Sequence, residues 1–389
     1  MIGGAAGRHL AEQGRSVALI GPGDQYSSHG DAARITRIVG RTGVWTELAA
    51  QAIGRYGDIA ERSRVDFHVP CGFLAAHCDA VDWAERAAVY GSDARLVDRA
   101  WVRETMGINI SNDLDLVFEG APGGYIRPRR LVAAQSRLAE AAGATVVNAE
   151  VDSLRGAAGG FEVSGSFGTI SARQVLLATG AFAGDLAAVQ LAVERRPRTV
   201  VMAEWEGFDD GREIPSLICD QPADERVEEI YWNPPVEYPD GVRRIKIGGN
   251  LATFVPLEQD QLIDWFHSDG NRDEVDSLSV NLRALLPDAD FGPLTSKPCV
   301  VTGTVTGYPY IGWIDEGIAD ARGGNGSSAK SSDEVGRIAA GDKAIITLMS
   351  YPDQPLKGHV NSIGWGIAQQ DGSTGFDLLP TINPTFEWI

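Results

Sequence analysis

The sequence has few cysteines, no long apolar run and no block of basic residues. Its four cysteines among 389 residues include no Cys-x-x-Cys pair, and its six histidines include no His-Glu-x-x-His motif, so we expect no metal site. No apolar run approaches the roughly 18 residues that span a bilayer, and the first residues lack the basic and apolar regions of a signal peptide. We therefore expect a cytoplasmic protein without membrane contact, whose cysteines are reduced.

The net charge is −19 and the isoelectric point is about 4.7. No run of five or more basic residues offsets this charge, which excludes a nucleic-acid partner. With 43% hydrophobic residues the chain can bury a large core, and its length suggests two or three domains.

The order of helical and strand-like segments favours an α/β fold. A helix is predicted over 3–13 and a short apolar strand over 15–23, so one strand before the helix would complete a β-α-β unit. Further segments follow: helices over 45–62 and from 127 to Gly143, β-rich sequence over 196–256, a helical pair over 260–287, strands over 297–315, and a Gly-rich loop feeding a helix over 321–350. Without a clear linker, the two halves of the chain are expected to interleave.

The opening stretch "MIGGAAGRHLAEQG" resembles the end of a dinucleotide-binding fingerprint. In that motif, glycines let backbone N–H groups approach a pyrophosphate at a helix N-terminus. Only its third glycine has a counterpart, Gly3, and the alternative is a frayed helix with small residues. The acid expected for the ribose at the end of the next strand is replaced by Gly21.

Two further stretches carry cationic side chains. In "SSHGDAARITR" (27–37), Arg34 and Arg37 are expected to share one edge, where arginine can hold a carboxylate bidentately. The alternatives are a solvated basic face for the arginines and a packed histidine for His29. In "RRIKIGGN" (243–250), strand alternation places Arg244, Lys246 and Gly248 on one face. We expect this face to be exposed to solvent, and the alternative is that it lines a cavity.

Two stretches near the end of the chain add a thiol and another lysine. Cys299 begins the apolar strand of "KPCVVTGT", and a cysteine in such a position is usually buried and inert. Lys330 lies within the Gly-rich "GGNGSSAKSS", and such a loop suits an anion or a carbonyl dipole.

In this order, from Gly3 to about residue 350, these stretches resemble the monomeric sarcosine oxidase family within the D-amino-acid oxidase-like group of flavoproteins. The matching segments are "GGAAGRHLAEQGRSVALI", "SHGDAARITR", "LVAAQSRLAEAAGATVVNAEV", "QVLLATGAF", "CVVTGT" and "ARGGNGSSAKSSDEVG". The resemblance implies a Rossmann-like FAD-binding domain (residues 1–70, 122–192 and 295–389) and an antiparallel-sheet substrate-binding domain (71–121 and 193–294).

The resemblance also implies roles for individual residues. Arg37 and Lys330 resemble the pair that clamps the substrate carboxylate, Arg34 the arginine near the flavin, and Lys246 the lysine that activates dioxygen. Cys299 resembles the cysteine that bonds covalently to FAD. The other residues expected at the cofactor are Gly3, Gly4, Ser28, His29, Val151, Thr179, Gly180, Gly324 and Gly326, together with Arg34 and Lys330.

The implied activity is oxidation of a secondary or N-substituted amino acid to an imine, which water hydrolyses, with hydrogen peroxide formed from dioxygen. Val301, Asn250 and Ser327 stand where the family has an aromatic residue and two histidines, so the substrate pocket is expected to differ from that of sarcosine oxidase. Tyr231, Trp232 and Tyr238 are candidates for another aromatic wall, or for ordinary packing. N-methyl, fructosyl and cyclic imino acids all remain open, as do a same-fold dehydrogenase and a flavin-less binding protein.

The first strand of the flavin domain and two of its glycines have no counterpart in the sequence. We expect the natural protein to start upstream, with Met1 as an internal methionine. The alternative is a truncated chain that binds flavin poorly.

Overall fold

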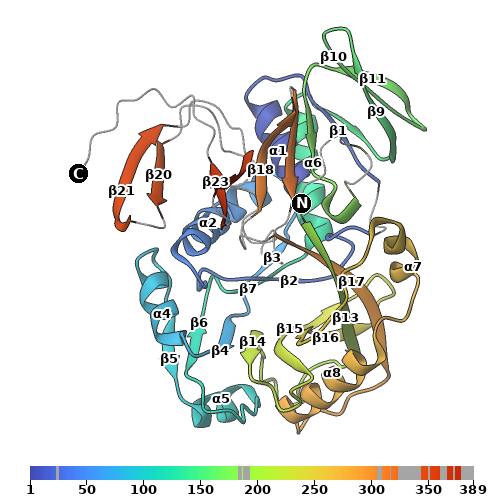
Figure 1. Cartoon of the computed structure of the whole chain (residues 1–389). Helices are drawn as coiled ribbons and strands as arrows, with labels where there is room; N and C mark the ends of the chain where they lie inside the picture. Colours follow the sequence, from blue (N-terminus) through green and yellow to red (C-terminus); the bar gives the residue numbers. More distant parts are fainter. Residues whose placement is uncertain are drawn as a thin grey trace.

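An eight-stranded mixed sheet organises the larger part of the α/β structure (Figure 1). The computed structural model describes residues 1–22, 26–182, 186, 193–304, 309–315, 317–322, 343–348, 351–359, 366–370 and 373–377. The eight strands, in spatial order, are β17 (Leu294–Thr304), β13 (Val193–Glu204), β16 (Arg243–Leu251), β15 (Val227–Glu237), β14 (Ser216–Asp220), β4 (Phe73–Ala76), β6 (Leu116–Glu119) and β5 (Arg95–Val97).

One face of this sheet, which we call the back face, is apolar. Residues such as Leu217, Ile230 and Trp232 point from it into a core completed by α8 (Arg272–Leu285) and α5 (Arg99–Met106). Figure 1 shows both helices at the bottom of the view, away from α1 and α6. Strand alternation requires the neighbours of these core residues to point the other way.

The opposite face, the front face, is apolar only at its β4–β6 end. There Phe73, Ala75 and Val117 pack in a core with side chains of four helices. These helices are α2 (Gly43–Gly54), α3 (Tyr56–Ser63), α4 (Ala80–Ala88) and α6 (Pro128–Ala141). Toward β17 the front face carries polar residues, which are described with the candidate site.

Helix α1 (Ile2–Glu12) lies between two smaller sheets. One pairs β1 (Ala18–Ile20) with β8 (Thr145–Val147) in parallel, and the other holds β12 (Val175–Leu177), β19 (Ile318–Arg322) and β18 (Tyr310–Asp315). A Cβ on Gly7 would lie 3.4 Å from Leu19, and one on Gly3 would lie 3.2 Å from Ala178. The small residues of α1 therefore let it approach both sheets closely.

The remaining described elements are antiparallel sheets and short helices. The strands are β2 (Arg34–Thr36), β7 (Gly124–Ile126) and β3 (His68–Val69) in one sheet; β9 (Val151–Ala157), β10 (Gly160–Gly165) and β11 (Gly168–Ala172) in another; and the pairs β20 (Lys343–Leu348) with β21 (Tyr351–His359) and β22 (Gly366–Gln370) with β23 (Ser373–Asp377). The short helices are η1 (Gly180–Phe182), η2 (Gln259–Gln261) and α7 (Leu262–Phe266).

Most predicted elements are present, and two predictions are wrong in part. The helix expected over 45–62 is broken after Gly54, because glycine is a poor helix former and the next helix begins at Tyr56. The helix expected within 321–350 lies mostly outside the described residues, and Lys343–Leu348 forms a strand instead. Among the described helices, none is long and apolar enough to cross a membrane. The predicted domain boundaries remain a prediction. They assign most of β17 to the FAD-binding domain and β13 to the substrate-binding domain, and β17 pairs with β13 along its whole length.

A buried acid lies at the start of α8, where this helix packs on the sheet. Glu274 is 0% exposed in the first turn of α8, where its N–H donates to Oδ1 of the capping Asn271 at 3.0 Å. Burial raises the pKa of Glu274 to about 7, although the nearby Thr199 and the charge of Arg198 act in the opposite direction. The unfolded chain releases this proton near the ordinary pKa, so deprotonation favours unfolding.

Stability is therefore expected to fall as the pH rises from about 5 to 8, by up to about 3 kcal/mol from this one group. Glu274→Gln should remove that part of the pH dependence in urea unfolding followed at several pH values. The exposed neighbour on the same helix, varied as Asp273→Asn, should keep the wild-type slope. An unchanged slope in Glu274→Gln would contradict the assignment.

Candidate active site

The strand register brings polar residues from distant parts of the chain onto the front face. Directly opposed residues of antiparallel strands point to the same side. Cys299 opposes Arg198, and Met202, two pairs further along β13 on the same side, opposes Lys246. On β15 the register continues with Asn233 opposite Lys246, Tyr231 opposite Gly248 and Glu229 opposite Asn250.

Lys246 is buried, so the default expectation of a solvent-facing lysine is wrong. It is 1% exposed, and its Nζ donates to Asp31 Oδ2 at 2.5 Å and to the Ala33 carbonyl at 2.9 Å. Burial lowers the pKa of Lys246, although Asp31 opposes this effect. For Asp31, burial alone would raise the pKa, but Lys246 and Arg34 hold it well below its usual range.

Arg34 joins the same group from the first position of β2. Its Nε and Nη2 donate to the Ser28 carbonyl at 3.2 and 3.0 Å, and its Nη1 lies 3.5 Å from Asp31 Oδ2. Burial alone would lower the pKa of Arg34, but Asp31 and a contact with the Cys299 thiol raise it. The structure therefore brings together Arg34, Lys246 and Cys299, three of the residues predicted for the site.

Arg37 belongs to a different environment, so the expectation that it shares one edge with Arg34 is wrong. Because β2 is extended, residues three apart project to opposite sides. The Arg37 guanidinium lies 4.9 Å from the Phe73 ring centroid and 5.4 Å from that of Trp83, and it donates to the Val39 carbonyl. Burial lowers the pKa of Arg37 to about 10, against the opposing charges of Glu229 and Glu119.

The three aromatic residues proposed as a wall point in different directions. Tyr231 lies on the front face over Gly248, where a Cβ would come within 2.5 Å of the phenol ring, and burial raises the pKa of Tyr231. Trp232 points to the back face and donates from Nε1 to the Pro215 carbonyl at 2.8 Å, so it does not line the site. Tyr238 packs against Ala33 and Val236.

The residues predicted around FAD occupy two regions. Gly3 and Gly4 lie in the first turn of α1, and Thr179 and Gly180 follow β12, next to the Ala178 that Gly3 approaches. Ser28 and His29 lie in the loop that Arg34 contacts. The others are Val151, which begins β9, and Gly324, Gly326 and Lys330, which lie outside the described residues.

These features fit FAD. Because Gly3 approaches Ala178 closely, the start of α1 lies against the end of β12, which pairs in parallel with β19. The free backbone N–H groups at such a helix start favour binding of a phosphate group. Arg34 and Lys246 both pair with one carboxylate, that of Asp31, which leaves a surplus of positive charge. This surplus suits the flavin ring, which gains negative charge on reduction. Asp31, Arg198 and Glu229 were not predicted from the sequence, although Asp31 lies in the "SHGDAARITR" segment.

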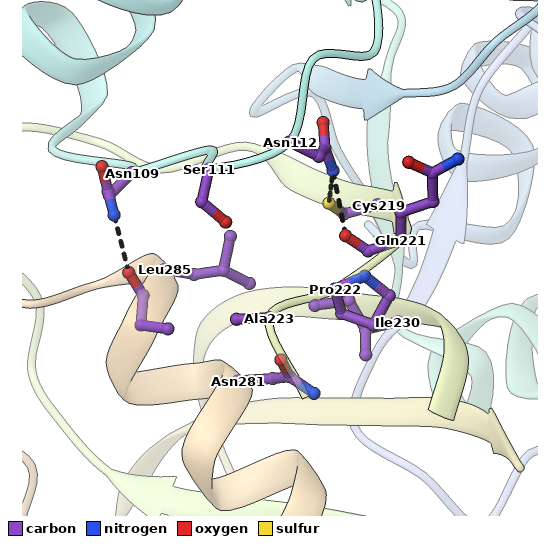
Figure 2. Close-up of a pocket in the computed structure, with 11 residues that line it drawn as sticks. Asn109, Ser111, Asn112, Cys219, Gln221, Pro222, Ala223, Ile230, Asn281 and Leu285 are labelled. Carbon is purple, nitrogen blue, oxygen red and sulfur yellow. Dashed lines mark hydrogen bonds between the residues drawn. The ribbon is translucent and has the colours of Figure 1, made fainter. Parts of the chain in front are cut away.

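Two other features of the surface do not belong to this site. Figure 2 shows a small pocket lined by Asn109, Asn112, Cys219 and Ile230 among others. Cys219 and Ile230 point to the back face, so this pocket lies across the sheet from Lys246. Possible metal-ligand atoms of His77, Cys78 and Asp79 lie within 4.8 Å of one another. The Asp79 N–H already donates to His77 Nδ1 at 2.9 Å, so we assign no metal there.

Residues 1–341 match the protein family described as FAD dependent oxidoreductase (DAO). The chain belongs to this family. It is an FAD-dependent oxidoreductase, as the sequence resemblance implied. A second match, to the AAEA-like beta-barrel domain, covers residues 332–389. No curated protein matches the chain.

Several solved structures share the fold. L-proline dehydrogenase from P. horikoshii is 16% identical over 86% of this chain and 88% of its own, with a TM-score of 0.67. The open form of NikD, an unusual amino acid oxidase, is 19% identical over 86% and 91%, with a TM-score of 0.67. Glycine oxidase from Geobacillus kaustophilus is 21% identical over 86% and 90%, with a TM-score of 0.62.

The Lys246–Asp31 contact predicts a measurable stability effect. Asp31→Asn leaves the buried ammonium without its carboxylate, so the free energy of unfolding should fall by about 3 kcal/mol in urea titrations of the FAD-loaded protein. Asp58→Asn removes an exposed partner of Arg62 and should cost less than about 1 kcal/mol. Equal effects of the two variants would show that the buried pair is not stabilising.

Proposed function

We propose that the protein oxidises a secondary or N-substituted amino acid and passes the electrons to dioxygen, giving hydrogen peroxide. The observation that carries this proposal is the burial of Lys246 on the same sheet face as Cys299, with Arg34 in contact with that thiol. A buried cation beside the predicted flavin position suits a reaction in which negative charge develops on oxygen.

Residues of both small sheets and of the front face would hold FAD. The first turn of α1 with Gly3 and Gly4 would face the pyrophosphate, with Thr179 and Gly180 beside it. Cys299 would attach the ring covalently. FAD, when bound, supplies the two-electron acceptor for the carbon–nitrogen bond of the substrate.

Lys246 would act through a fixed positive charge. Its ammonium is shielded from water and held by Asp31 and the Ala33 carbonyl, so it needs no reorganisation when charge develops nearby. In a site of low dielectric constant such a charge acts more strongly than in water. This arrangement supports a role in reducing dioxygen.

Arg37, with Lys330, is proposed to bind the substrate carboxylate, as the family resemblance implies. A bidentate contact from arginine would fix the acid end and leave the neutral amine free to meet the reacting ring. Loss of two electrons and two protons, one proton from the nitrogen and one from the adjacent carbon, gives an imine, which water hydrolyses to a carbonyl compound and an amine.

A peroxide-coupled screen tests the overall activity. N-methyl amino acids, cyclic imino acids and fructosyl amino acids should be compared on the FAD-loaded protein. Peroxide formed in step with substrate loss would support the oxidase. Turnover without peroxide would indicate a dehydrogenase with another electron acceptor, and absence of flavin from the folded protein would contradict both.

Lys246→Met should slow reoxidation of the reduced flavin by dioxygen at least tenfold, because the buried charge is lost, with a much smaller effect on flavin reduction. Stopped-flow measurements of the two half-reactions separate these effects. The control is Lys297→Met, which removes an exposed lysine two residues before Cys299. Equal slowing of both half-reactions by Lys246→Met would contradict the role in oxygen reduction.

Acid precipitation tests the covalent role of Cys299. We expect the yellow colour to stay with the precipitated wild-type protein and to be released from Cys299→Ser, because only a thiolate at this position can form the thioether. Cys71→Ser serves as the control and should retain the colour. Release of the colour from the wild-type protein would show that FAD is bound without a covalent bond.

A further inference from the structure

Three aromatic side chains from distant parts of the chain meet, and none of them was assigned to the site from the sequence. The ring centroids of Tyr26 and Phe266 are 5.3 Å apart, those of Phe182 and Phe266 are 5.9 Å apart, and those of Tyr26 and Phe182 are 6.1 Å apart. We call these three residues the aromatic triad. Each of its side chains is half-buried, and rings at such distances attract one another. The triad joins the segment between β1 and β2, the turn η1 and helix α7.

A hydrogen bond adds to the ring contacts of Tyr26. Its hydroxyl and Nε2 of His267 are 2.5 Å apart, and the two rings meet edge to face with their centroids 5.6 Å apart. His267 directly follows Phe266, so the same end of α7 holds Tyr26 by a polar and an apolar contact. Tyr26 has a φ of 59°, which bulky side chains rarely adopt, so these contacts hold it against its backbone preference.

Arg195 on β13 fastens two segments of the triad to the large sheet. Its Nε donates to the Ala181 carbonyl in η1 at 3.0 Å, and its Nη2 donates to Gln259 Oε1 in η2 at 2.7 Å. Because η1 contains Phe182 and η2 leads directly into α7, one guanidinium constrains both phenylalanines. Both η1 and α7 also pack against β17.

The triad connects the two places predicted for FAD. Phe182 is two residues after Gly180, which is expected beside the pyrophosphate. Trp265, the neighbour of Phe266, donates from Nε1 to the Cys299 carbonyl at 2.9 Å, and Cys299 is expected at the flavin ring. The ribityl chain of FAD joins its ring to its pyrophosphate. An FAD molecule that reaches both places therefore passes the triad.

We propose that the aromatic triad is a clasp that closes over the ribityl chain of FAD, between the pyrophosphate and the flavin ring. Entry and release of the cofactor then both require the Tyr26 side chain to turn away from Phe266 and His267. Asp31 keeps the rest of that loop on the sheet, and Arg195 keeps the two phenylalanines in place. The inference rests on the FAD position in the proposed function, and it requires neither the proposed substrate nor the electron acceptor.

The exchange rates of FAD test the clasp in Cys299→Ser, where no covalent bond retains the cofactor. On this background Tyr26→Ala should raise the rate constant of FAD dissociation at least tenfold and that of association at least threefold. Dissociation is followed by the rise of flavin fluorescence on dilution, and association by its quenching when FAD is mixed with the apoprotein. Tyr26→Phe keeps the ring and loses the hydrogen bond, so both constants should rise about two- to fivefold.

Two further variants separate the clasp from general destabilisation. Tyr90→Ala removes a tyrosine that is 37% exposed and should change neither constant. Phe266→Leu removes the ring that touches both other members of the triad. It should accelerate both steps, and it serves as the second variant where Tyr26→Ala fails to fold. Loss of packing alone accelerates only dissociation, so faster dissociation with unchanged association in both variants would overturn the clasp.

Failure of this inference is distinguishable from failure of the proposed reaction. Both rate constants are measured without substrate, so a protein that oxidises no amine still gives a result. Where Cys299→Ser holds no FAD, the rate at which the wild-type apoprotein takes up FAD is compared with that of Tyr26→Ala, and the variant should be at least threefold faster. Unchanged exchange and uptake of FAD in Tyr26→Ala would overturn the clasp and would leave the oxidase proposal to the peroxide screen.

Discussion

The buried contact of Lys246 with Asp31 fixes how the loop before β2 lies on the large sheet. Lys246 comes from β16, Asp31 comes from the segment between β1 and β2, and the Ala33 carbonyl completes the ammonium's contacts. Two charges taken out of water are stable only if each keeps its partners, so neither segment can move alone. Arg34 is carried by the same loop, and its contact with Cys299 follows from that placement.

The fold could be predicted from the sequence wherever one side of an element is apolar. Alternation along 243–250 correctly assigned Lys246 and Gly248 to one side of a strand, and the small residues of the first helix indicated close packing, which Gly3 and Gly7 provide. Which side of the strand meets solvent was not predictable. That depends on α8 covering the back face and on the loop before β2 covering Lys246, and both contacts join segments far apart in the chain.

The candidate site was predicted in part for the same reason. The resemblance gave Arg34, Lys246 and Cys299 roles at the flavin, but it did not reveal Asp31 as the carboxylate between two of them. Arg37 was grouped with Arg34 by spacing alone, whereas the extended backbone of β2 separates them and stacks Arg37 on Phe73 and Trp83. Glu229 had no sequence signal, because an acid in a β-rich segment is ordinarily exposed and only the register with Asp220 and Asn250 shows its setting.

The front face therefore carries two charge imbalances of opposite sign. Around Asp31, two cations share one carboxylate, and around Glu229, three carboxyls face two guanidiniums. Tyr231 lies between them on the same strand as Glu229, over a glycine that leaves room for its ring. A molecule with separated charges experiences a field along this face, strengthened by the low dielectric of the surroundings. The same sheet register that buries Lys246 also sets the positions of these two groups of charges on the front face.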